Sequence, residues 1–127
     1  MSQQKVKIIS GWSDPGGSTA HHISLTNLLN ENGYDCTYFG PQMYHLDKCQ
    51  SGKIQDATID PDDIIISHFI EFAPRKLKKH ILSCHEKAMF SLKERDLSQY
   101  DVIQFVSNQQ KKFHGVNHPS VIIPPRS

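Results

Sequence analysis

The stretch SGWSDPGGSTAHH, residues 10–22, places a glycine pair shortly before two adjacent histidines. Gly16 and Gly17 lack a Cβ, so the backbone there can approach a ligand closely. If a helix begins at this point, its first amides offer hydrogen bonds to an anion such as a phosphate. A tight turn between a strand and a helix uses the same residue types. The local pattern therefore fits a plain turn and a ligand-binding loop equally well.

Four more polar residues follow apolar runs that are predicted to be strands, which makes them candidate site residues. His85 can act as a general acid or base, as a hydrogen-bond donor to a substrate or as a metal ligand. Glu86 beside it can orient a substrate hydroxyl. A purely structural role is the competing interpretation for a lone histidine. The candidates are His68, His85, Glu86 and Ser107.

The chain has eight histidines, which raises the question of a metal site. It contains no HExxH motif and no Cys/His group with the spacing of zinc ligands. His21 and His22 are neighbours whose side chains would point about 100° apart on a helix, so they do not easily chelate one ion. We expect one of the two to face a ligand and the other to face solvent or the core. We expect no metal and no other cofactor.

Two common nucleotide-binding motifs are missing from the sequence. The dinucleotide fingerprint GxGxxG is absent, and no acidic residue ends the second predicted strand. The phosphate loop GxxxxGK[ST] is absent as well. NAD binding and the hydrolysis of ATP or GTP are therefore disfavoured.

The residues around the glycine pair predict a strand, a loop and a helix. Val6–Ser10 is a β-branched apolar run that is typical of a buried strand. Residues 21–32 carry apolar side chains at helical spacing, and Gly33 follows as a C-terminal stop. Ser18 or Thr19 offers a hydroxyl that can cap the start of this helix.

The rest of the chain alternates short strands with helices. Residues 34–39 predict the second strand, and residues 64–66 predict a strand that is covered on both faces. This alternation predicts an α/β fold with a Rossmann-like, doubly wound parallel sheet and helices on both faces, in a single domain spanning residues 1–127. The other expected strands are 53–55, 80–84, 101–106 and 120–123, and the other expected helices are 72–79, 87–95 and 107–113.

Parallel sheets bind ligands at the carboxyl ends of their strands. The first predicted strand brings the glycine pair to that edge, and later strands bring His68, His85 and Ser107. We therefore expect four strand ends to contribute to one site.

Composition limits the classes of partner. The chain has 127 residues with a net charge of +1, from 14 basic and 13 acidic residues, so no strong field attracts nucleic acid. The basic run 75–79 fits a solvated helix face better than a membrane patch. Three cysteines without a CxxC pair favour a reducing cytoplasm. No apolar run approaches the roughly 20 residues that span a bilayer, so membrane contact would be peripheral.

Several segments together resemble the N-terminal domain of glycosyltransferases of the GT-B fold, in particular the large retaining family 4. They are KVKIISGWSDPGGSTAHHISLTNLLNENGYDCTYFGP at 5–41, ILSCHEK at 81–87, YDVIQFVSNQQKKF at 100–113 and SVIIPP at 120–125. The resemblance covers nearly the whole chain. In that family the first domain holds the acceptor side, and a second Rossmann-like domain holds most contacts to the nucleotide sugar.

The resemblance implies roles for individual residues. Gly16 and Gly17 match the loop that approaches the donor phosphates and the acceptor, and His85 matches the histidine near the transferred sugar. Ser107 matches the serine that begins the helix after the last core strand. His85 is accordingly the expected catalytic residue, and the expected substrate contacts are Gly16, Gly17, Ser18, His21, His68, Glu86 and Ser107.

The resemblance also implies that two domains share the reaction. The C-terminal donor-binding domain of the family is absent from this sequence, so the chain corresponds to the acceptor half of a hexosyltransferase. We expect the isolated chain not to turn over, because the leaving diphosphate would lack its main electrostatic partner. The expected ligands are a nucleotide sugar and a saccharide or lipid-linked acceptor, with no nucleic acid.

Two alternatives use the same fold. One is a non-catalytic module that binds a glycan or a protein, which the missing half and the altered sequence at 18–21 favour. The other is a regulatory nucleotide-binding domain, for which the sequence offers no fingerprint.

Overall fold

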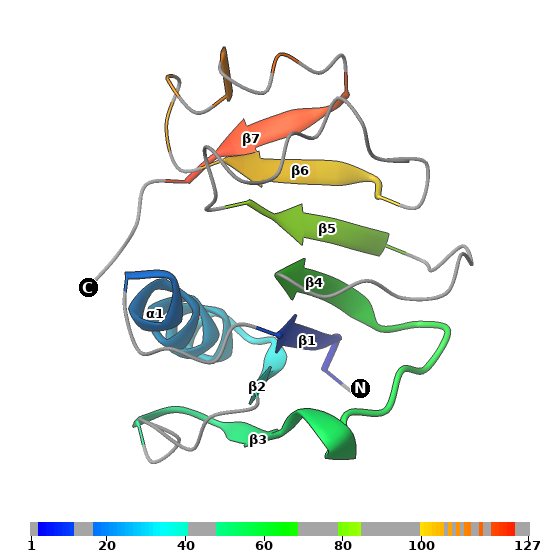
Figure 1. Ribbon diagram of the computed structural model, residues 1–127. Coiled ribbons are helices and arrows are strands. Elements are labelled where there is room, and N and C mark those ends of the chain that lie inside the picture. The colour runs from blue at the N-terminus through cyan, green and yellow to red at the C-terminus, as the bar shows by residue number, and fades with distance from the viewer. Residues whose placement is uncertain are drawn as a thin grey trace.

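The computed structural model describes residues 3–11, 17–40, 48–68, 79–84, 100–105 and 118–123, together with 107, 109, 111–112 and 115. Within these residues it contains one long helix, one short 3-10 turn and a parallel sheet (Figure 1). The elements are β1 (Lys5–Ser10), α1 (Gly17–Glu31), β2 (Asp35–Gly40), β3 (Ser51–Lys53), the 3-10 turn (Ile54–Asp56), β4 (Ile64–His68), β5 (Lys79–Ser83), β6 (Val102–Phe105) and β7 (Ser120–Ile122).

The sheet has seven strands in the order β3-β2-β1-β4-β5-β6-β7, and every neighbouring pair is parallel. The first six positions follow the strand order of Rossmann folds, and β7 extends the sheet at its far edge. The predicted fold class, a single α/β domain of Rossmann-like type, is confirmed. After β1 the chain adds β2 and β3 on one side of that strand, and it then crosses to the other side to add β4. Strand order therefore reverses between β1 and β4.

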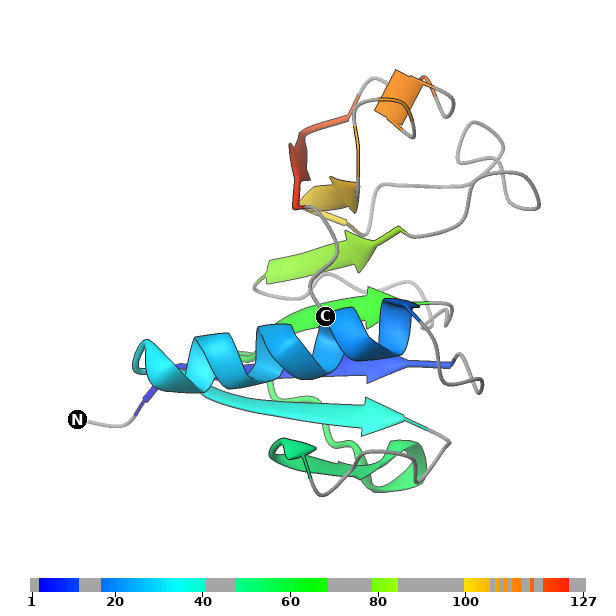
Figure 2. The ribbon, with the colours of Figure 1, turned by 90° about the vertical axis from the view of Figure 1, so that its left-hand side faces the viewer.

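Helix α1 covers the face of the sheet formed by β1, β2 and β4, and its first turn lies at the carboxyl ends of these strands (Figure 2). Its buried positions are four residues apart, since His21 precedes Leu25 and His22 precedes Thr26. The helix ends at Glu31, and the predicted stop Gly33 follows it with a φ of +92°. There the Tyr34 N–H donates to the Leu29 carbonyl and the Gly33 N–H to the Asn30 carbonyl. These two bonds form a Schellman motif, which satisfies carbonyls at the helix end.

Apolar side chains cover both faces of the sheet. Beneath α1, one core joins Val6, Ile8, Leu25, Cys36, Tyr38 and Ile66. On the opposite face, Ile9 and Ile65 form a second group, packed against the chain that leads from β3 to β4. A third group, also on the opposite face, consists of Leu82, Cys84, Tyr100, Ile103 and Phe105.

The structure shifts several predicted boundaries. Helix α1 begins at Gly17, four residues before the predicted start at His21, so Ser18 and Thr19 lie inside its first turn. The short third strand is Ser51–Lys53, and the expected strand 53–55 is mostly the 3-10 turn.

The later helices are only partly described. Lys79 belongs to β5 and not to the expected helix 72–79. The rest of that helix and the whole of the helix expected at 87–95 lie outside the described residues. Gln109, Lys111 and Lys112 are helical, within the helix predicted at 107–113. Of the helices in the described part of the chain, none is long and apolar enough to cross a membrane.

Candidate functional site

The carboxyl edge of the sheet carries polar side chains at the point where strand order reverses. Ser10, the last residue of β1, pairs in register with His68, the last residue of β4. The Ser10 hydroxyl and His68 Nδ1 are 2.9 Å apart, and the Gly11 N–H donates to the His68 carbonyl. In open parallel sheets this reversal is where ligands bind. The side chains of β1 and β4 are therefore joined at the expected position.

The same edge receives two histidines from the first turns of α1. His22 Nε2 lies 2.9 Å from the Ser83 hydroxyl at the end of β5. The side-chain amide of Gln104 on β6 lies 2.9 Å from His21 Nε2. The amide NH₂ group of Gln104 donates, so His21 Nε2 accepts this bond. Two hydrogen bonds thus tie the start of α1 to two different strands.

These side chains form one group, which we call the carboxyl-edge cluster. The rings of His22 and His68 have centroids 5.0 Å apart, and those of His21 and His22 are 5.3 Å apart. Every member is at most 2% exposed. Burying a polar group without a hydrogen bond costs free energy, and each member of the cluster has one hydrogen-bond partner within it. The members are Ser10, His21, His22, His68, Ser83 and Gln104.

No family model, curated protein or solved structure matches the chain. Functional conclusions therefore depend on the residues and on their geometry.

The structure brings some of the predicted site residues together. His21 and His68 are both members of the carboxyl-edge cluster. Gly17 is the first residue of α1, and Ser18 is the second. Ser107 is half-buried beyond β6, and its carbonyl accepts the Lys111 N–H at 3.1 Å, as expected at the start of a helix. Gly16, His85 and Glu86 lie outside the described residues.

For the two adjacent histidines, the structure decides between solvent and the core. Both His21 and His22 are fully buried and both reach the sheet, so neither faces solvent. The two side chains point in different directions from the helix, so His21 contacts β6 and His22 contacts β5. Counting back four residues from the buried positions Leu25 and Thr26 would have placed both on the buried side.

Three members of the cluster were missed from the sequence. Ser10 and Ser83 end strands and Gln104 lies within one, and these residue types are common in such positions. The only sequence signal for them is the alternation of a strand, because each follows an apolar residue two positions earlier and so lies on the same face of the sheet. Nothing in that pattern indicates which histidine each one meets. No three His, Cys, Asp or Glu side chains come together as metal ligands within the described ranges.

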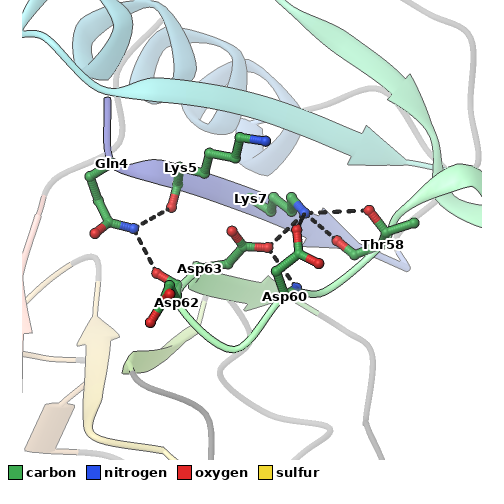
Figure 3. Close-up of polar contacts among 7 residues, drawn as sticks. All are labelled: Gln4, Lys5, Lys7, Thr58, Asp60, Asp62 and Asp63. Carbon is green, nitrogen blue, oxygen red and sulfur yellow. Dashed lines mark hydrogen bonds and ion pairs between the residues drawn. The ribbon is translucent and has the colours of Figure 1, made fainter. Parts of the chain in front are cut away.

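A second buried polar group lies on the opposite face of β1, and we call it the Lys7 network (Figure 3). The Lys7 ammonium lies 2.6 Å from an Asp63 carboxylate oxygen and 3.8 Å from Asp60. It also donates to the Thr58 carbonyl. Asp63 in turn accepts the Asp60 N–H at 2.8 Å. The network attaches residues 58–63, which lead into β4, to the central strand.

Proposed function

We propose that this chain is the acceptor-side, Rossmann-like domain of a GT-B glycosyltransferase of the retaining family 4 type. In this proposal the start of α1 faces the phosphates of a nucleotide sugar, and the same edge receives a saccharide or lipid-linked acceptor. A second domain, joined or separate, would hold the nucleotide. The reaction would take place in the cytoplasm, at a membrane surface when the acceptor is lipid-linked.

The observation that supports the proposal most is the position of the first turn of α1. This 15-residue helix begins at Gly17, at the carboxyl edge where strand order reverses between β1 and β4. The first amides of a helix have no partner within the helix, and its dipole favours negative charge there. A diphosphate is the chemistry that such a position accepts best.

The carboxyl-edge cluster holds that turn in place. Its buried histidines, His21 and His22, lie four and five residues after Gly17 and are hydrogen-bonded to β6 and β5. The amides ahead of them are thereby fixed relative to the sheet before a ligand arrives. Such preorganisation lets donors stabilise developing charge on a leaving diphosphate without a reorganisation cost. We assign the cluster this positioning role, because its side chains are buried. His85 stays the proposed catalytic residue, and Glu86 stays a proposed contact to a sugar hydroxyl.

The proposal can be tested by NMR on the ¹⁵N-labelled chain, titrated with pyrophosphate and with a panel of UDP-, GDP- and ADP-sugars. We expect saturable shifts of the amide signals of Gly17, Ser18 and Thr19, which weaken as salt is raised. Gly17→Asp would place a carboxylate at the helix start, which favours the helix but repels phosphate. Binding should then weaken about tenfold or more, which corresponds to about 1.4 kcal/mol.

Gly17→Asn is the matched control, because it adds a side chain of the same size without the charge. It should retain most of the affinity. If no diphosphate moves these amides, or if both variants bind equally well, the phosphate role is wrong. Saturable shifts with free saccharides and none with diphosphates would instead support a glycan-binding module.

A further inference from the structure

Cys36 and Cys49 lie next to each other on the α1 face of the sheet. In the β2–β3 ladder Tyr38 pairs with Ser51, and the same register carried two residues back places Cys36 opposite Cys49. Cys49 packs against the core group that contains Cys36. Two residues that are in register on parallel strands also point to the same side of the sheet.

The segment that carries Cys49 is attached on both sides. The Tyr38 N–H donates to the Gln50 carbonyl at 3.0 Å. The Gln50 side chain donates to Asp35 at 2.6 Å and to Thr37 at 2.8 Å, both on the face of β2 that points away from α1. Because Gln50 points to that face, its neighbour Cys49 points to the α1 face.

Helix α1 holds the same segment from the other side. The Asn27 side chain donates to the Lys48 carbonyl at 3.0 Å, directly before Cys49. The position of Cys49 therefore does not depend on β3 alone. Adjacent strands lie about 4.8 Å apart, which is within the roughly 4.4–6.8 Å between the Cα atoms of a disulfide. The Cβ atoms of a disulfide are about 3.5–4.5 Å apart, so the segment at Cys49 has to shift slightly towards β2 when the bond forms.

The surroundings suit a disulfide better than two thiolates. Cys36 is fully buried among Val6, Ile8 and Tyr38, and Cys49 is half-buried at the margin of that group. An apolar setting disfavours a charged sulfur, whereas a disulfide is neutral and gives up no strong hydrogen bond. The surroundings therefore favour a disulfide over the thiolates that metal binding would need.

We infer that Cys36 and Cys49 are an oxidisable pair that forms a reversible disulfide between β2 and the residues before β3. A peroxide supplies the oxidising equivalents. The more exposed thiol, Cys49, attacks one peroxide oxygen and becomes a sulfenic acid, and the first water leaves. The Cys36 sulfur then attacks the Cys49 sulfur, the S–O bond breaks, and the hydroxide takes the Cys36 proton to leave as the second water.

The environment also sets the speed of this reaction. Burial raises the pKa of the Cys36 thiol to about 12, and burial raises the pKa of the Cys49 thiol as well. Thiolates are the reacting species, so the disulfide should form slowly at neutral pH and faster as the pH rises. A disulfide that forms only under sustained oxidation is the expected behaviour.

Trypsin digestion provides a direct test, because it cuts after Lys7, Lys48 and Lys53 and so separates the two cysteines. Cys36 falls in the peptide 8–48 and Cys49 in the peptide 49–53. The folded chain is treated with hydrogen peroxide at pH 7 and at pH 9, alkylated and digested. We expect these two peptides to be joined, with the loss of two hydrogens, more rapidly at pH 9. Dithiothreitol should release them.

The third cysteine supplies the matched control. Cys84 lies on the opposite face of the sheet, packed with Leu82 and Tyr100. Cys84→Ser should leave the linked peptides unchanged, and Cys49→Ser should abolish them. The inference fails if peroxide gives only sulfinic acid on Cys49, if the recovered link involves Cys84, or if the native chain shows no link at either pH. None of these outcomes bears on phosphate binding at α1.

Discussion

On the face of the sheet beneath α1, the buried polar groups are imidazoles, hydroxyls and one side-chain amide. Behind β1, on the opposite face, the buried polar group is a full positive charge beside a full negative one. Lys7 and Asp63 are the only buried residues with a formal charge among the described residues, apart from the histidines. The carboxyl-edge cluster is joined by three hydrogen bonds of 2.9 Å, while the Lys7 network centres on one ion pair of 2.6 Å.

The difference follows from what each group must hold. The chain between the 3-10 turn and β4 is irregular. The Lys7 ammonium binds the Asp63 carboxylate and the Thr58 carbonyl of this segment. The start of α1 is instead held by hydrogen bonds from its two histidines to side chains of β5 and β6. The charged group attaches an irregular segment to β1. In our proposal, the hydrogen-bonded group positions the start of α1 for a phosphate.

The largest expected effect comes from breaking the ion pair on one side. Asp63→Ala would leave the Lys7 ammonium buried with only its Thr58 contacts and the more distant Asp60. Removing one partner of a buried pair costs about 3–5 kcal/mol, because the remaining charge has lost its compensation. Urea denaturation should show a loss of that size. The imidazole NMR signals of the carboxyl-edge cluster should stay in place at low denaturant.

Asp62→Ala is the control for this prediction, since it removes the same charge one position earlier from an exposed residue. Its effect should stay within about 0.5 kcal/mol. If the two substitutions prove equally mild, Lys7 and Asp63 do not form a clamp.

A smaller loss is expected from the neutral cluster. Ser83→Ala removes the hydroxyl that meets His22 Nε2 at 2.9 Å. Losing one partner of a buried neutral hydrogen bond costs about 1–3 kcal/mol. A double-mutant cycle with His22→Ala should show a coupling of about 1 kcal/mol between the two sites. Fully additive single effects would mean that this hydrogen bond contributes nothing.

Much of the framework around the site could be predicted from the sequence. The β-branched run before Gly11, the helical spacing and the stop at Gly33 gave β1 and α1 to within a few residues. The parallel sheet and its common carboxyl edge followed from the alternation of strands and helices, whereas the order of the strands was not predicted. His68 was expected at that edge because it ends an apolar run, and that is where it lies.

The partners inside the two buried groups could not be predicted in the same way. Ser83 meets His22 only because β5 pairs beside β4 in one particular register. Lys7 lies in a run that the sequence predicts as a buried strand, and its carboxylate partner comes from an irregular segment that has no periodicity. The Cys36–Cys49 pairing likewise depends on the register of a three-residue edge strand. Local sequence patterns predict helices and strands, whereas these side-chain contacts depend on the register between strands and on the path of the loops.

The smallest expected effect introduces a charge on the neutral face. Burial raises the pKa of Cys36 from 9.0 to about 12, so between these pH values the unfolded chain releases a proton that the folded chain keeps. Stability from this group is fully present below pH 9 and is lost as pH rises towards 12. Between pH 8 and pH 10 the loss is at most about 1.4 kcal/mol. Denaturation under reducing conditions should show a steeper fall for the native chain than for Cys36→Ala. Equal slopes would mean that burial does not raise the pKa of Cys36.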